Sequence, residues 1–301
     1  MPTLSYRSVF VSDLHLGTAD AQAEYLLDFL DHVECEYLFL NGDIFDIWKM
    51  RTRRWRWPQI KTRLLQRLVG LASRGVRVIY VPGNHDAFFR DYLGCEMAGV
   101  EVHREYQHRL ADGRRALVLH GDEFDGLVRH NRLLKLLGNG GYELLMWLNR
   151  INHHWRRRSG RSYWSLSSAV KNQVPNARVY VDKFEQAAIG HARERGFDAV
   201  ICGHIHKANL RQDDGVTYAN SGDWVEHCTA LVEQADGRLE LIDWARDSGQ
   251  LIDRAAGRQS EEMPAVADPV RVPGVLPLDA MFEGRLPAQG RDTRRLDRAG
   301  H

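Results

Sequence analysis

Long apolar runs and a strong net charge are both missing from this sequence. No stretch approaches the roughly 20 consecutive apolar residues that a transmembrane helix needs. Among 301 residues, 41 basic and 40 acidic side chains leave a formal net charge of +1. No overall charge therefore favours nucleic acid as a partner. The first apolar run begins so close to Met1 that we expect no signal peptide ahead of it.

Cysteine is scarce, and its spacing excludes two common roles. The four cysteines lie far apart in the chain, and no Cys-x-x-Cys pair occurs; they are Cys35, Cys95, Cys202 and Cys228. Thiolate zinc sites and the disulfide frameworks of secreted domains both use characteristic close spacings. We therefore expect reduced, mostly buried thiols in a cytoplasmic protein.

Proline is rare until the C-terminal segment, where the composition changes. Five of the nine prolines follow Ala245, among Arg, Asp, Gly and Ala. Such a segment cannot bury enough apolar surface to offset the entropy lost on ordering. We predict one domain over residues 1–244 and a mostly disordered tail, dispensable for chemistry, over residues 245–301. The alternative is a short docking segment at Val270–Phe282.

A repeated pattern is present instead: a short apolar run that stops at Gly, His, Asp or Asn. It occurs in five blocks, which are Asp13-Leu14-His15, Gly42-Asp43, Gly83-Asn84-His85-Asp86, His120-Gly121-Asp122 and Gly203-His204-Ile205-His206. Such runs predict buried strands that deliver polar residues to a sheet edge. Glycine at these ends lets the backbone turn sharply and approach a ligand closely. One block alone is equally well explained by a cap or a paired core residue, but five together predict a metal site.

The spacing within the first block predicts how its two polar side chains are oriented. Asp13 and His15 are two residues apart, so on an extended chain both side chains point to the same side. We expect this carboxylate and this imidazole to form half of a metal site.

Strand and helix patterns alternate along the first half of the chain and predict a layered α/β domain. Ala21–Val33 reads as an amphipathic helix, and Pro58 suits the start of a second one. Residues 124–195 break this rhythm with helical segments at Leu127–Leu137, Tyr142–Ile151, Ser165–Gln173 and Ala177–Arg195. We expect these residues to be an insertion over the metal face, outside the sheets. Strands near 217–219, 228–233 and 238–244 complete the domain.

In this order the five blocks resemble the calcineurin-like metallophosphoesterases, over roughly residues 8–244. The resemblance implies an α/β fold with a four-layer αββα sandwich, a helical lid insertion at 124–195 and two divalent metal ions. It assigns the ligands of one ion as Asp13, His15 and His206, and those of the other as Asn84, His120 and His204, with Asp43 as the bridge. Oxygen and nitrogen ligands without thiolate suit Mn²⁺, Fe²⁺ or Zn²⁺, and we favour Mn²⁺.

The same block that supplies Asn84 supplies the candidate catalytic residues. His85 is expected to stabilise a phosphoryl group or to protonate the leaving oxygen, and Asp86 is expected to orient His85. Asp122 is either a turn residue of its block or an outer support of the site.

A narrower resemblance is to the UDP-2,3-diacylglucosamine diphosphatases of lipid A synthesis. It rests on the insertion and on two segments, Gly42-Asp43-Ile44-Phe45-Asp46-Ile47-Trp48 and Asn220-Ser221-Gly222-Asp223-Trp224. It implies hydrolysis of a nucleotide-sugar lipid to UMP and 2,3-diacylglucosamine 1-phosphate at the cytoplasmic face of the inner membrane. The apolar side chains of the insertion would hold acyl chains, and the basic run His153–Arg161 would face anionic lipid or diphosphate. The alternatives are leucines that pack the insertion's own core and a solvated basic face.

One departure from that family leaves the substrate open. Its best-known members carry Arg where His85 stands, and a His can donate a proton whereas an Arg only stabilises charge. A phosphodiesterase or phosphatase acting on a cyclic nucleotide or a phospholipid-like ester is therefore the alternative function. A binding module with an inactive metal site is disfavoured because no ligand position is lost.

Overall fold

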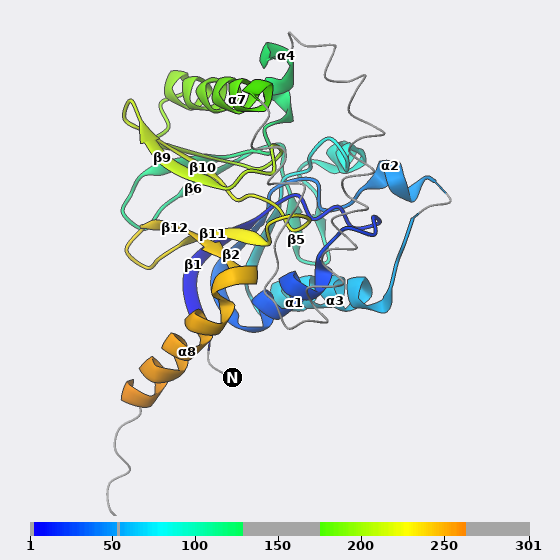
Figure 1. Cartoon of the computed structure of the whole chain (residues 1–301), viewed down its shortest axis with the longest axis vertical. Helices are drawn as coiled ribbons and strands as arrows, with labels where there is room; N and C mark the ends of the chain where they lie inside the picture. Colours follow the sequence, from blue (N-terminus) through cyan, green and yellow to red (C-terminus); the bar gives the residue numbers. More distant parts are fainter. Residues whose placement is uncertain (1–2, 53–54, 129–174, 263–301) are drawn as a thin grey trace, which may run out of the picture. The chain divides into compact units, whose positions relative to one another are not determined.

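The computed structural model describes residues 3–52, 55–128 and 175–262, and these residues contain two β-sheets packed face to face (Figure 1). The seven-stranded sheet has the order β12 (Leu239–Asp243), β11 (Thr229–Glu233), β1 (Leu4–Val11), β2 (Val33–Leu40), β3 (Arg77–Tyr80), β5 (Val100–Val102) and β4 (Glu96–Met97). The five-stranded sheet has the order β6 (Tyr106–Arg109), β7 (Arg115–Val118), β8 (Ala199–Cys202), β10 (Val216–Asn220) and β9 (Asn209–Asp213). All but residues 261–262 of the described part belong to one compact unit, Met1–Ser260.

Parallel pairing in both sheets brings several strand ends to one edge. β1 pairs with β2 and β2 with β3 in parallel, and so do β7 with β8 and β8 with β10. Polar residues that follow these strands are therefore delivered to the same edge of each sheet.

The interface between the sheets is apolar and follows the two-residue period of the strands. On β1, Phe10 faces the other sheet, whereas Val9 and Val11 face the outer helices. Phe10 stacks on Phe39 of β2 with a ring-centroid distance of 4.5 Å. The other sheet contributes Ala116, Val118, Ala199, Ile201 and Ala219 to this core.

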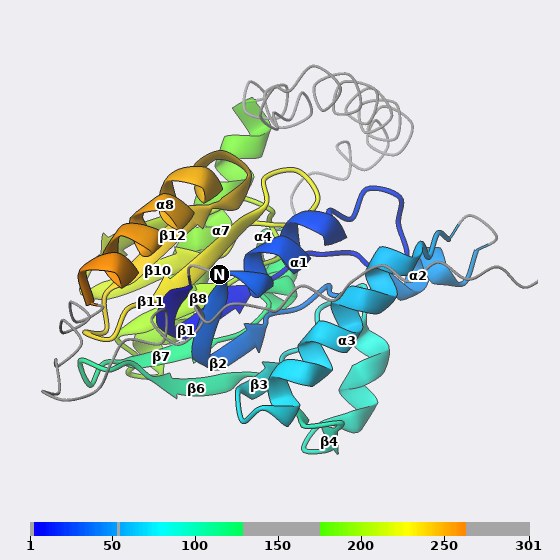
Figure 2. The same ribbon diagram turned by 90° about the horizontal axis from the view of Figure 1, so that it is seen from below.

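Helices cover the outer face of each sheet. α1 (Ala23–Asp31), α3 (Gln59–Ser73) and α8 (Trp244–Glu262) pack their apolar faces on the seven-stranded sheet, and Figure 2 shows them lying across it. α7 (Pro175–Glu194) covers the five-stranded sheet through contacts with β8 and β10 (Figure 1). The four-layer αββα order predicted from the sequence is confirmed. Among the described residues, no helix is both long and apolar enough to cross a bilayer.

The boundary predicted at residue 244 is wrong for the residues that follow it directly. Residues 245–262 belong to α8, where Leu251 and Ile252 pack against the core and Ala255 is 2% exposed. These three residues share one helical face, so α8 is amphipathic. The prolines of the C-terminal segment begin only at Pro264, after this helix. Residues 263–301 lie outside the described residues.

The predicted insertion is also shorter than expected at its C-terminal end. The segment predicted as a helix at Ala177–Arg195 is α7, and it is a layer of the sandwich. Its apolar stripe is fully buried on the five-stranded sheet and consists of Phe184, Ala188, Ile189 and Ala192. α4 (Asp125–Val128) follows the single turn η2 (Asp122–Phe124) at the other end. Outside the described residues lie the predicted lid position, the basic run, the predicted helices at Tyr142–Ile151 and Ser165–Gln173, and all but the first two residues of the one at Leu127–Leu137.

Candidate metal centre

All five sequence blocks meet at the carboxyl ends of the central strands. Asp13 follows β1, Asp43 follows β2, Asn84 follows β3, His120 follows β7 and His204 follows β8. Within the described residues, three groups of side chains place one donor atom each within 4.8 Å of the others; they are Asp13, His15 and His206, then His15, Asp43 and His85, and then Asp43, His120 and His204. The blocks therefore form one continuous cluster across two sheets.

The backbone reaches this arrangement by a route that the sequence did not indicate. Asp13 and His15 have φ angles of 53° and 50°, so they are in the left-handed region and not on an extended chain. The loop is held by the neighbouring one, because Asp13 N donates to Gly42 O at 3.0 Å and His15 N donates to Asp43 O at 2.8 Å. His204 and His206 also have positive φ. Strained residues persist where surrounding structure fixes them, and they cluster at functional sites.

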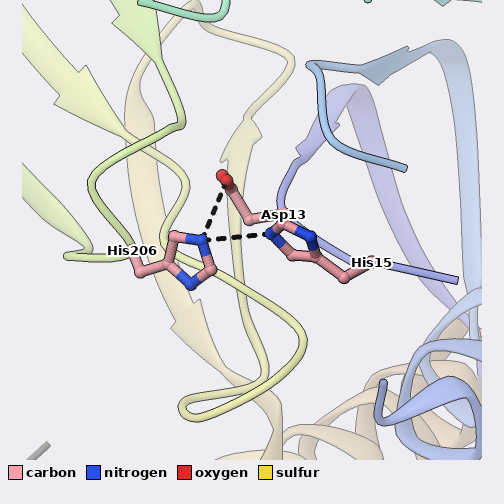
Figure 3. A group of neighbouring side chains, drawn as sticks. All are labelled: Asp13, His15 and His206. Atoms are coloured by element: carbon pink, nitrogen blue, oxygen red, sulfur yellow. Dashed lines mark hydrogen bonds and ion pairs between the residues drawn. The ribbon is translucent and has the colours of Figure 1, made fainter. Parts of the chain in front are cut away.

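The first group of side chains converges on one point (Figure 3). His206 Nε2 lies 3.2 Å from Asp13 Oδ1 and 3.2 Å from His15 Nε2. Asp13 is fully buried. Burial raises the pKa of Asp13, but the imidazoles of His206 and His120 together outweigh burial and hold that pKa below its usual range. A buried carboxylate that stays ionised beside two imidazoles is a suitable half-site for a cation.

Asp43 faces both sides of the cluster. Its Oδ2 lies 3.4 Å from His120 Nε2 and 3.8 Å from His15 Nε2. Burial lowers the pKa of the His120 imidazole, yet the Asp43 carboxylate overcomes burial and raises that pKa to about 10. The carboxylates thus attract positive charge strongly. Because a carboxylate has several lone pairs, Asp43 can contact two cations at once.

Asn84 and His120 have the hydrogen-bonding patterns expected of metal ligands. Asn84 Oδ1 is buried and accepts no hydrogen bond from the described residues. Leaving such an atom unpaired costs on the order of 1–3 kcal/mol, so it needs a compensating partner. His120 Nδ1 donates to Asn41 O at 3.0 Å, so the neutral imidazole that a cation needs would carry its lone pair on Nε2.

The glycines next to these donors leave no room for a side chain. A Cβ on Gly83 would lie 2.3 Å from Asp43 Oδ1, and a Cβ on Gly203 would lie 2.6 Å from Asp13 Oδ2. The donor set and its close packing fit divalent cations.

The carboxylate of Asp86, which was expected to orient His85, has other partners. Asp86 is fully buried, and its carboxylate accepts backbone N–H groups of Gly83 at 2.6 Å and Ile44 at 2.7 Å, as well as the Tyr80 hydroxyl. Burial raises the pKa of Asp86. Asp86 therefore ties the loops after β2 and β3 together, and the prediction that it orients His85 is wrong.

Asp46 contacts His85 in its place. Asp46 Oδ2 lies 3.3 Å from His85 Nδ1 and 3.6 Å from His15 Nδ1, and the Trp48 ring centroid is 4.1 Å from that of His85. Sequence reasoning assigned no role to Asp46. The available signal was ambiguous, because Asp46 also precedes the short helix α2 (Ile47–Met50) and caps it by accepting Lys49 N at 2.8 Å.

Asp122 supports the site from outside. Its carboxylate accepts a hydrogen bond from Arg90 Nη2 at 2.6 Å, and the same nitrogen donates to Pro82 O at 3.0 Å. This pair connects the loops that follow β3 and β7. The supporting role is therefore favoured over that of a simple turn residue.

Comparison with known families agrees with this geometry. A family model described as "Calcineurin-like phosphoesterase" matches residues 6–208, which include every candidate ligand. The chain belongs to the calcineurin-like phosphoesterases. Members of this family use a dinuclear centre of divalent metal ions.

This phosphoesterase is also similar to bacterial proteins named "UDP-2,3-diacylglucosamine hydrolase". The one from Neisseria gonorrhoeae is 28% identical over 77% of this chain and 96% of its own length. The one from Porphyromonas gingivalis is 32% identical over 72% of this chain and 90% of its own length. The one from Aliivibrio fischeri is 23% identical over 74% and 92%, respectively.

Proposed function

We propose that this phosphoesterase hydrolyses the diphosphate of UDP-2,3-diacylglucosamine to UMP and 2,3-diacylglucosamine 1-phosphate. The observation that carries the substrate is the similarity to the named hydrolases over 90% or more of their length. The observation that supports the chemistry is the cluster of buried oxygen and nitrogen donors at the strand ends. A diacylated substrate lies at a membrane surface, so the proposal makes this a peripheral protein of the cytoplasmic face of the inner membrane.

The proposed ligands divide between the two sides of the cluster. Asp13, His15 and His206 would hold one ion, Asn84, His120 and His204 would hold the other, and Asp43 would be shared by both. Two bound ions, for which Mn²⁺ is our first choice, would acidify a water molecule and neutralise charge on the phosphoryl oxygens. The chain itself holds the donors in place through its left-handed loops and through Asp86.

His85 is the proposed contact to the phosphoryl group. Its side chain is 26% exposed, and the Asp46 carboxylate and the Trp48 ring restrict its orientation. An imidazole there can stabilise phosphoryl charge and can also protonate a poor leaving group. That second ability specifically favours the alternative function, a phosphodiesterase or phosphatase acting on a different ester.

Two parallel reactions separate the proposed diphosphatase from the alternative phosphodiesterase or phosphatase. The purified full chain with Mn²⁺ is given UDP-2,3-diacylglucosamine in one reaction and an aryl phosphodiester in another. The proposal predicts release of UMP in the first reaction and much slower turnover in the second. Rapid hydrolysis of the diester with no UMP would establish the alternative. If both reactions fail with metal bound, neither function holds.

A further inference from the structure

Asp125, the first residue of α4, contacts a proposed metal ligand although no sequence block contains it. Its Oδ1 lies 2.9 Å from His204 Nε2. The hydroxyl of Tyr180, on α7, donates to the same oxygen at 2.7 Å. The His204 side chain is only 12% exposed, so its ring nitrogens have few alternative partners in solvent.

This contact decides which nitrogen of His204 is available to a cation. An ionised carboxylate only accepts hydrogen bonds, so the bond to Asp125 requires the proton on Nε2. A neutral imidazole that is protonated on Nε2 has its free lone pair on Nδ1. His204 shares a donor group with Asp43 and His120, so its ring belongs to the side of the cluster assigned to the second ion. Carboxylates that accept the outer N–H of a ligating histidine fix both its tautomer and its ring orientation.

α7 holds this pair in place through two residues that are one turn apart. Tyr180 contacts the polar partner of His204, and Phe184 lies against the imidazole with a centroid distance of 6.0 Å. Phe184 is fully buried and makes an edge contact with Phe124 at 5.6 Å. Residues at i and i+4 lie on the same helical face, so α7 presents both to His204 together.

We propose that Asp125, held by Tyr180, is a positioning residue that presents His204 Nδ1 to the second cation and thereby sets the affinity of that cation. The inference rests on the ligand role proposed for His204. It holds for any phosphoester substrate, so it can be tested without one. It also gives α7 a role that its position as an outer layer does not suggest.

Calorimetric titration of the metal-free full chain with Mn²⁺ measures both sites. We expect Asp125→Ala to weaken one of two binding events by about 10–100-fold and to leave the other unchanged. Tyr180→Phe should weaken the same event by a smaller factor. The double variant should bind no more weakly than Asp125→Ala alone, because Tyr180 acts through Asp125. Asp182→Ala, at an exposed position of α7, and Tyr92→Phe, at an exposed ring, are the matched controls and should change neither event.

A spectroscopic measurement separates positioning from general support. ¹⁵N NMR of the imidazoles at a fixed alkaline pH should show His204 protonated on Nε2 in the metal-free chain, and Asp125→Ala should shift this towards a mixture of tautomers. Unchanged Mn²⁺ affinities in Asp125→Ala, or a proton on Nδ1 in the parent chain, would overturn this inference alone. If His204→Ala still binds both ions normally, the ligand assignment fails and this inference fails with it.

Discussion

The metal centre and a second buried cluster of the described residues, around Glu233, both combine imidazoles with carboxylates, and they differ in how completely their polar atoms are paired. Between the sheets, Glu233 accepts hydrogen bonds from Arg7 Nη1 at 2.6 Å, from His108 Nε2 at 2.9 Å, from Ala111 N at 2.7 Å and from the Ser8 hydroxyl. At the strand ends, by contrast, Asn84 Oδ1 is buried without a partner among the described residues.

The two clusters also differ in the backbone conformation of their residues. Ser8, His108 and Glu233 lie inside the regular strands β1, β6 and β11. The candidate ligands lie just beyond strand ends, and Asp13, His15, Asp43, His204 and His206 all have positive φ. Burial of charged groups therefore does not distinguish a functional site by itself. An unpaired acceptor beside strained loops does, because both are costs that the fold retains only for a reason.

The largest expected effect comes from removing the charge that both sides of the metal centre share. Asp43→Asn should lower turnover on the order of 10³-fold or more and should abolish binding of one Mn²⁺, since the acidified water depends on both ions. Activity and calorimetric stoichiometry measure this. Chelator treatment of the parent chain should reproduce the loss, and full activity in either sample would refute a dinuclear mechanism.

A chain that ends at Trp244 tests how much α8, which contains none of the cluster residues, contributes to stability. It lacks the buried apolar face of α8, so we expect its free energy of unfolding to fall by at least about 3 kcal/mol. A chain that ends at Glu262 retains α8 and is the control, with stability expected to match the full chain. Urea denaturation compares them. Equal stability of the two truncated chains would show that α8 contributes nothing to the core.

Glu233→Gln tests the fully paired cluster. Burial raises the pKa of Glu233, but the hydrogen bonds from His108 and Ser8 outweigh it and lower that pKa to about 2. A depressed carboxyl pKa stabilises the fold above the unfolded value of 4.5 and loses this contribution as pH falls towards 2. The variant should lose about 3 kcal/mol at neutral pH and become less sensitive to pH over that window.

The control measurement for Glu233→Gln is its affinity for Mn²⁺. Because Glu233 belongs to the cluster between the sheets, the folded variant should bind Mn²⁺ as tightly as the parent chain. A weaker affinity would mean that the two clusters are coupled and that the contrast between them is false.

Asp46→Ala should have a moderate effect on the metal centre in addition to the loss of the α2 cap. Losing the carboxylate that contacts His15 and His85 should lower kcat by about 10–100-fold, because both rings lose their orientation. Asp46→Asn is the control for the helix cap, since Asn also caps helices well. If both variants keep the parent kcat while Asp46→Ala only lowers stability, Asp46 is a cap and nothing more.

The smallest effect is expected for His85→Arg. If the leaving group is a phosphate, it needs little protonation, so an Arg that stabilises charge should preserve most of the activity on UDP-2,3-diacylglucosamine. If the leaving group is an alkoxide, the change should cost the roughly 10²–10⁴-fold typical of a lost general acid. Steady-state rates on both substrates decide between these outcomes.

Much of this fold could be predicted because its signals are local. The strands predicted near 217–219, 228–233 and 238–244 are observed as β10, β11 and β12. The alternation of strand and helix patterns predicted a layered α/β domain, and the family resemblance implied its four layers. The ligand blocks were found because each joins a short apolar run to Gly, His, Asp or Asn in a few consecutive residues. α8 was missed because Leu251, Ile252 and Ala255 are a weak amphipathic signal next to a proline-rich segment.

The sequence by itself determined which residues carry donor atoms, and its apolar runs predicted strands that deliver these residues to a sheet edge. Only the tertiary structure decided which donors face one another. Asp46, not the adjacent Asp86, contacts His85, and Asp125 contacts His204 from a distance of 79 residues. Such contacts depend on left-handed loop residues and on the packing of α7, which arise from interactions between distant segments. Local sequence patterns contain no information about those distances, whereas the folded chain does.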